Sequence, residues 1–270
     1  MNGMKKDVKG QVSVFVIIAV VVVVVAVGIV YFNGQSTKND IAYFNSLEVK
    51  SDFDRSQALI LNCYDLIADG SLDTVGIQGG YYDDAKNKRE LDGDYEGVFI
   101  PYYYYEGEIN IPSREDIEGN MEKYVEDYFP DCIDSIEMEG FDFNYRKGSA
   151  SVSIKEKSVE FEVSSSVDIR RDGHSITFDL GDYPLPKNSA LSDIYDLAFF
   201  ISDSHNVNPA MYCISCVNEM AVEDDLYVDV KYLDDFSVLT IISENYTSSE
   251  SYSYMFLNKY TGREVSTTLI

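Results

Sequence analysis

Residues 10–32 read GQVSVFVIIAVVVVVVAVGIVYF, and this stretch decides how the rest of the chain is interpreted. From Val14 to Phe32 it holds 19 residues without a charge, close to the roughly 20 that a helix needs to cross a bilayer. In lipid the backbone must satisfy its own hydrogen bonds, and a helix does so even where β-branched valines dominate. The sequence therefore predicts a transmembrane helix over residues 11–32, through which the protein contacts the membrane.

The charges on the two sides of this run predict its orientation. Lys5, Lys6 and Lys9 precede it, and the next basic residue is Lys38. Positive charges favour the cytoplasmic side of a membrane. We therefore expect a single pass through the cytoplasmic membrane, with the N-terminus inside and the main domain outside. A secretory signal that is removed after residues 26–28 remains the alternative.

The order of lysine, Gly10, Gln11 and apolar helix resembles the class III signal of archaeal type IV pilins and pilin-like envelope proteins. This resemblance implies that residues 1–10 are a cytoplasmic leader and that a prepilin peptidase cuts between Gly10 and Gln11. It also implies that the apolar helix stays attached and can join a homo-oligomer. One departure is Phe15, which stands where bacterial pilins carry glutamate. The remainder looks like uncharacterised archaeal membrane-anchored proteins, and that likeness implies no activity.

The part outside the membrane is strongly acidic. Without the three Lys and one Asp of the leader, the chain carries 18 basic and 46 acidic residues. Nucleic acids and anionic lipids are bound by patches of Lys and Arg, so neither is an expected partner of this part. Its apolar content is sufficient for a folded core. The charge fits either solubility or cation binding.

The pattern of helices and strands predicts an α+β fold with an antiparallel sheet and packed helices. We expect a stalk at 33–50, a helical and tyrosine-rich subdomain at 51–135, and an antiparallel sheet with two helices at 136–270. The first soluble helix should end at Gly70, and the second should start with a capping box of Ser113 and Asp116 and end before Pro130. Residues 138–181 read as a four-stranded meander with a hairpin turn at 172–173. Further helices are expected at 190–203 and 209–221, and further strands at 226–233, 237–243 and 253–260.

Two stretches of the tyrosine-rich region are candidate binding sites. Tyr102, Tyr103, Tyr104 and Tyr105 follow one another in a predicted strand, so two side chains point to each face. They form either a binding surface or part of the core. Residues 92–97 match the first half of a calcium loop, but the twelfth position is Tyr103 instead of a bidentate glutamate. No complete metal site or cofactor site is therefore predicted.

The four cysteines are expected to form disulfides, because their number is even and the domain is predicted to be exported. Three connectivities are open. We favour Cys63 with Cys132, and Cys213 with Cys216. The second pair also has the spacing of a redox motif. If the helix starts at Pro209, however, Cys213 is its fifth residue and lies beyond the strongest field of the helix dipole, which favours a structural role.

The sequence names no catalytic residue, and it leaves three functions open. The first is a non-catalytic structural or adhesive envelope domain that is pilin-like. The second is an anchored domain that binds a ligand or cation. The third is an envelope thiol–disulfide oxidoreductase that uses the cysteine pair. Asn245 begins the N-glycosylation sequon Asn245-Tyr246-Thr247 and is a candidate modification site.

Overall fold

The computed structural model describes residues 38–46, 49–91, 97–207, 213–233, 235–244 and 252–260. The predicted leader, the predicted span and the first part of the stalk lie outside these ranges. Among the described residues, no helix is both long and apolar enough to cross a bilayer. The described part is α+β with mainly antiparallel strands, which confirms the predicted fold class there.

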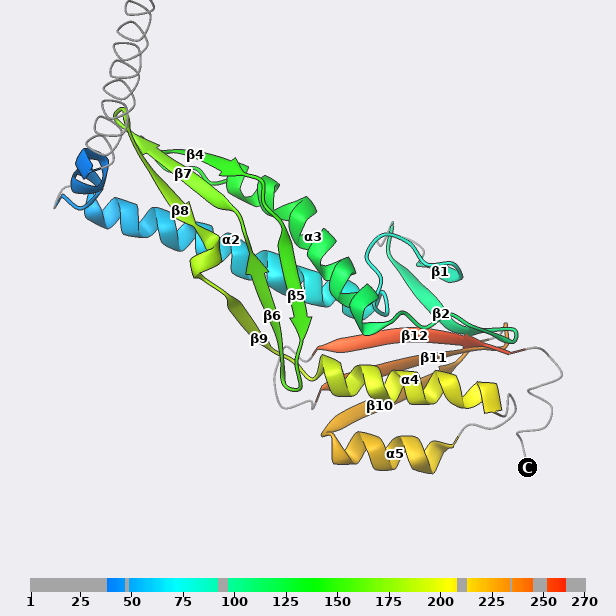
Figure 1. The fold of residues 1–270 in the computed structure, drawn as a ribbon. Helices are drawn as coiled ribbons and strands as arrows, with labels where there is room; N and C mark the ends of the chain where they lie inside the picture. Colours follow the sequence, from blue (N-terminus) through cyan, green and yellow to red (C-terminus); the bar gives the residue numbers. More distant parts are fainter. Residues whose placement is uncertain are drawn as a thin grey trace, which may run out of the picture.

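Two long helices, α2 (Lys50–Ile77) and α3 (Arg114–Asp134), lie side by side in the centre of the molecule (Figure 1). The expected end of α2 at Gly70 is wrong, because the helix continues to Ile77. A β carbon at Gly70 would lie 2.7 Å from the hydroxyl oxygen of Tyr124 on α3. The glycine therefore makes room for contact between the two helices and does not end one of them.

The start of α3 has the predicted capping box. The backbone N–H of Asp116 donates to Ser113 Oγ at 3.1 Å, and the backbone N–H of Ser113 donates to Asp116 Oδ2 at 3.0 Å. The predicted end before Pro130 is wrong. A proline inside a helix costs about 3 kcal/mol, but the helix continues because Ile133 is fully buried and Cys132 is bonded to α2.

A long antiparallel ribbon packs against these helices, and it has three strands instead of the predicted four. Each strand is interrupted once near its middle. The segments are β4 (Asp142–Arg146) and β5 (Ala150–Ile154), then β6 (Ser158–Val163) and β7 (Ser166–Arg171), then β8 (His174–Asp179), the short helix η1 (Leu180–Asp182) and β9 (Leu185–Asn188). The strand made of β6 and β7 is central, because β7 pairs with β4 and β8 while β6 pairs with β5 and β9.

The interruption has a local cause at Gly148. A β carbon at this position would overlap the carbonyl oxygen of Ser164 on the neighbouring strand. At the same place the N–H of Ser164 donates to the carbonyl oxygen of Ser149 at 2.9 Å. Residues 147–149 lie opposite residues 164–165, so the register shifts by one residue, as in a β-bulge. The chain therefore continues in the same direction through Gly148 instead of turning back.

The outer edge of β5 is closed by three glutamates of α3. Their Oε1 atoms accept hydrogen bonds from alternate backbone N–H groups of the strand: Glu126 from Ala150 at 3.1 Å, Glu122 from Val152 at 3.0 Å and Glu118 from Ile154 at 2.8 Å. Four helical residues rise about 6 Å and two strand residues about 6.7 Å, so the two rows stay in step. We call these three side chains the glutamate ladder.

A second sheet lies at the other end of the molecule, and α4 (Leu191–Val207) and α5 (Ile214–Glu223) lie along one side of it (Figure 1). Its strand order is β1 (Lys88–Glu90), β2 (Phe99–Tyr105), β12 (Ser253–Lys259), β11 (Ser237–Glu244) and β10 (Leu226–Tyr232), with β3 (Glu108–Ile109) also paired to β2. Among the described strands, only β2 and β12 run parallel. The sheet combines segments from before and after residue 135, so the predicted subdomain boundary does not separate the two sheets.

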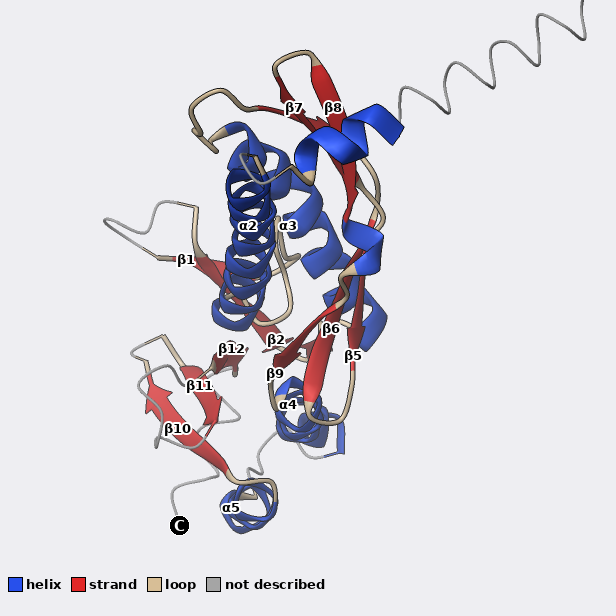
Figure 2. Ribbon diagram, turned by 90° about the vertical axis from the view of Figure 1, so that its left-hand side faces the viewer, coloured by secondary structure: helices blue, strands red, loops and turns tan. Residues whose placement is uncertain are grey.

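The described chain begins at residues 38–44, a helical segment that contacts the tip of the β7–β8 hairpin (Figure 2). The hydroxyl of Tyr43 donates to Asp172 Oδ2 at 2.7 Å, and the Tyr43 ring stacks on His174 with centroids 4.1 Å apart. Asp40 Oδ1 lies 2.9 Å from His174 Nδ1. The predicted hairpin turn is confirmed, with positive φ at Asp172 and Gly173. The segment before α2 is therefore fixed to the ribbon.

Candidate functional site

The cysteine pair of the second half lies at the beginning of α5. Cys213 is the N-cap of this helix, and its Sγ accepts a hydrogen bond from the N–H of Cys216 at 3.3 Å. The expected helix start, Pro209, lies outside the described residues, and α5 begins at Ile214 within them. The two cysteines form a disulfide. The argument that Cys213 lies too far along the helix to feel its dipole is therefore wrong.

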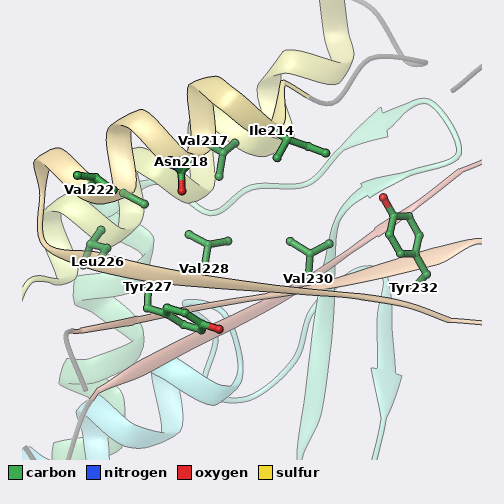
Figure 3. Close-up of a pocket in the computed structure, with 10 residues that line it drawn as sticks. Ile214, Val217, Asn218, Val222, Leu226, Tyr227, Val228, Val230 and Tyr232 are labelled. Atoms are coloured by element: carbon green, nitrogen blue, oxygen red, sulfur yellow. The ribbon is translucent and has the colours of Figure 1, made fainter. Parts of the chain in front are cut away.

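An apolar groove begins at Ile214, the residue after Cys213, and runs between α5 and β10 (Figure 3). Figure 3 shows Ile214 over Val230, Val217 over Val228, and Val222 beside Leu226. The groove measures about 370 Å³. We call it the α5–β10 groove. Its lining residues are Ile214, Val217, Asn218, Ala221, Val222, Leu226, Tyr227, Val228, Val230 and Tyr232.

Large apolar side chains on this face are exposed, which is unusual in a protein with a formal net charge of −26. Val222 is 71 % exposed, Ile214 69 % and Tyr232 77 %. Phe236, in the turn after β10, is also exposed. A contiguous exposed apolar surface on a soluble domain usually marks a contact site. The groove and its rim are therefore the candidate functional site.

The two ends of the groove differ in electrostatic character. At the beginning of α5, the backbone N–H groups of the first turn give a partial positive charge. At the other end, burial raises the pKa of Asp224, and the neighbouring Asp193 and Glu223 raise it further. Lys157 lies 2.6 Å from Asp193 and partly compensates this acidic end. A thiolate formed by reduction of the disulfide would be stabilised at the Cys213 end.

The other predicted site residues lie away from this groove. Cys63 and Cys132 form a disulfide between α2 and α3, so both favoured cysteine pairs are bonded in the structure. His205, a possible further metal ligand beside the cysteine pair, is buried, and its Nε2 lies 2.9 Å from the hydroxyl of Tyr260. Within the described ranges, no three His, Cys, Asp or Glu side chains are grouped as metal ligands.

The proposed tyrosine surface is corrected by the burial of its members. Tyr102, Tyr103 and Tyr104 are 6 %, 0 % and 2 % exposed, and Tyr105 is half-buried. Their strand β2 has partners on both edges, and Tyr103 shares a 2.6 Å hydrogen bond with the hydroxyl of Tyr254. Burial raises the pKa of Tyr103, which stays protonated. Of the two readings, core packing is therefore the correct one for Tyr102, Tyr103 and Tyr104.

Three sequence-based sites fall outside the described residues. They are the leader cleavage site Gly10 and Gln11, the sequon residue Asn245 and the acidic turn 92–96. The groove itself was missed, although its strand and helix were both expected. Its signal was the apolar face of β10, with Val228, Val230 and Tyr232 at alternate positions. A sequence pattern alone does not tell whether such a face is covered.

Comparison with known proteins gives no relative: no protein-family model, no curated protein and no solved structure matches this chain.

Proposed function

We propose that this chain is an exported, membrane-anchored protein of the cell envelope whose domain makes non-catalytic contacts through the α5–β10 groove. The observation that carries the proposal is the exposed apolar groove on an otherwise acidic protein. The pilin-like leader and the apolar run over residues 11–32 support export and anchoring. We further propose that a prepilin peptidase removes the leader after Gly10.

The arrangement of the domain supports this role. Residues 38–44, which follow the proposed anchor, contact the β7–β8 hairpin at one end, while α5 and β10 lie at the opposite end (Figure 1). The contacts of Tyr43 with Asp172 and His174 fix the first described segment to the ribbon. A groove at the end far from the membrane is accessible to another protein in the envelope.

The mature N-terminus of the native protein tests anchoring and processing together. We expect the first residue to be Gln11, and the protein to remain in the membrane fraction after a high-salt wash. A Gly10→Leu variant should keep the leader and have the mass of the unprocessed chain. A matched Gly34→Leu variant should be processed normally. A mature protein that starts after residue 28 and leaves the membrane would refute the proposal.

A second function, thiol–disulfide exchange, is favoured by the position of Cys213 as the N-cap of α5. In this reaction a substrate thiolate attacks one sulfur of the Cys213–Cys216 disulfide and releases the other cysteine as a thiolate. A second substrate thiol then attacks the mixed disulfide, so the substrate dithiol is oxidised and the cysteine pair is reduced. The N–H of Cys216, 3.3 Å from Cys213 Sγ, favours Cys213 as the released thiolate.

Selective alkylation tests this second function. After reduction, Cys213 should react with iodoacetamide at pH 6, because a helix N-terminus lowers a thiol pKa from about 8.5. Cys216 should react only at higher pH, and a Cys216→Ser variant should leave the reaction of Cys213 unchanged. If both thiols react only above pH 8, the pair is a structural disulfide and the exchange function is rejected.

A further inference from the structure

The outer edge of β10 is open. The strand order of its sheet ends at β10, and no described segment pairs with its outer side. An exposed strand edge invites pairing with another chain, and proteins usually block it. This protein blocks the edge of β5 with the glutamate ladder. The strand orders also end at β1, β4, β8 and β9, but among the described edge strands β10 is the one that lines the α5–β10 groove.

The hydrogen bonds within the sheet show which backbone groups of β10 point outward. The N–H of Leu233 donates to the carbonyl oxygen of Ser237 at 2.8 Å, at the point where β10 turns into β11. In an antiparallel pair, residues that bond to the partner alternate with residues whose groups face the other edge. Lys231 and Asp229 therefore bond to β11, in register with Leu239 and Ile241. The groups that face outward belong to Leu226, Val228, Val230 and Tyr232.

We propose that β10 pairs antiparallel with β10 of a second copy of this chain, about a two-fold axis at Val230. In this register Val230 faces Val230 of the other copy, and their outward N–H and C=O groups bond to each other. Asp229 lies opposite Lys231 of the other copy. By symmetry, Lys231 lies opposite Asp229 of the other copy. These are non-hydrogen-bonded positions, where opposed side chains are closest. Within one copy the two residues already lie 3.7 Å apart and are exposed.

Charge selects this register over its neighbour. A two-fold axis at Asp229 uses the same outward backbone groups, but it places Asp229 directly opposite Asp229 of the other copy. Like charges at directly opposed positions destabilise a strand pair. The axis at Val230 replaces that repulsion with two attractive pairs, so a chain that is acidic overall can still associate along this strand.

The shape of the α5–β10 groove fits the same register. Figure 3 shows α5 over the half of β10 that runs from Leu226 to Val230, and Tyr232 beyond the end of the helix. The two-fold axis places the half of β10 that is covered by α5 at opposite ends of the paired strands in the two copies. The two α5 helices therefore approach each other only at their first residues. Tyr232 lies opposite Val228 of the other copy, on the face that carries the groove. The exposed Tyr232 of each copy thus enters the groove of the other, and Ile214 lies near the axis.

The contact is isologous, because the same surface is used on both copies, and it closes as a dimer. The dimer supplies the partner for the contact role proposed above. It rests on that proposal only for its location in the cell envelope. A chain that proves not to be anchored can still form this dimer. Conversely, an anchored chain that stays monomeric refutes the dimer alone.

Cysteine cross-linking tests the register in the full chain in mild detergent. In a background with Cys213→Ser and Cys216→Ser, a Val230→Cys variant should form a covalent dimer on oxidation, because this residue faces itself across the axis. The matched Asp229→Cys variant should cross-link weakly. Stronger cross-linking of Asp229→Cys, equal cross-linking of both, or none in folded protein would each overturn the proposal.

A charge exchange tests the ion pairs by sedimentation equilibrium in the same detergent. Lys231→Glu turns both attractive pairs into repulsive ones and should weaken the dimer about ten-fold. The double variant Asp229→Lys with Lys231→Glu restores opposite charges across the axis and should recover the dimer. Both side chains are exposed, so folding should not change, and circular dichroism checks this. A double variant no tighter than Lys231→Glu, or wild-type chain that is monomeric, would overturn the proposal.

Discussion

Replacing Cys63 and Cys132 together by alanine is expected to destabilise the domain strongly. The disulfide joins residues 69 positions apart and connects α2 to the last turn of α3. Closing a loop of this length removes entropy from the unfolded chain that corresponds to about 4 kcal/mol at 25 °C. The free energy of unfolding of a typical domain is about 5–15 kcal/mol. The double variant should therefore lose a large part of its stability.

Urea unfolding of the full chain in mild detergent measures this loss. The chain has 22 Tyr and no Trp, so tyrosine fluorescence reports on the folded domain. The matched control replaces Cys213 and Cys216 by alanine. That disulfide spans only three positions, and the same loop-closure entropy corresponds to a stabilisation of about 2 kcal/mol. We expect the variant that lacks Cys63 and Cys132 to have a lower free energy of unfolding than the variant that lacks Cys213 and Cys216.

Two results would contradict this reasoning. One is a Cys63→Ala, Cys132→Ala variant whose unfolding midpoint equals that of the wild type. The other is a control variant that loses as much stability as the first. Either result would mean that loop closure does not determine the effect. In that case the packing of α2 against α3 in the folded state, and not the covalent bond, would determine the stability of this helix pair.

Three further changes test the ribbon. Glu122→Leu removes an acceptor for a strand N–H and should cost about 1–3 kcal/mol in urea unfolding, whereas Glu122→Gln keeps an acceptor and should cost less. Gly148→Ala should lower the melting temperature, because the new β carbon overlaps the carbonyl oxygen of Ser164; Gly119→Ala, which has open space and no positive φ, is the control for overlap and should not lower it. Burial raises the pKa of Asp168. Hydrogen bonds from Thr177 and Arg146 lower this pKa by more, so the net pKa lies below the usual value. The stability that Asp168 provides is therefore present above about pH 4 and is lost as the pH falls through the lowered pKa. Asp168→Asn should be less stable than wild type at pH 7, and the difference should shrink below pH 4; a difference that does not change with pH would contradict this assignment.

The parts of the fold that depend on local chemistry could be predicted from the sequence. The capping box of Ser113 and Asp116 and the turn at Asp172-Gly173 each involve residues within a few positions of one another. The alternation of apolar residues also predicted the last three strands, β10, β11 and β12. These signals need no knowledge of distant segments, because the interacting groups are neighbours in the chain.

The features that depend on distant segments could not be predicted in this way. Gly70 reads as a helix end, but its role is set by Tyr124 on another helix. Gly148 lies where the predicted four-stranded meander would need a turn, but its role is set by Ser164 on the next strand. The tyrosines of β2 are buried because β12, some 150 residues later, pairs with their strand. None of these partners is visible in a local pattern.

The candidate site was predicted in part for a similar reason. The spacing of Cys213 and Cys216 identified the pair, but the position of the helix start could not be fixed, since Pro209 gave a stronger local signal than Cys213. The groove depends on which face of β10 remains uncovered. That is a property of the whole arrangement of α4, α5 and the sheet, and it appears only when these elements are placed together.

The disulfide between Cys63 and Cys132 also determines how the domain responds to a pulling force. A tension applied along the chain between residue 38, which follows the proposed membrane span, and β10 enters the bridge at Cys63 and leaves it at Cys132. Residues 64–131, which include β2, then carry no load. A chain of this length would extend by roughly 230–250 Å if it were pulled straight. The bridge removes that extension, so a domain pulled between residue 38 and β10 lengthens by that much less.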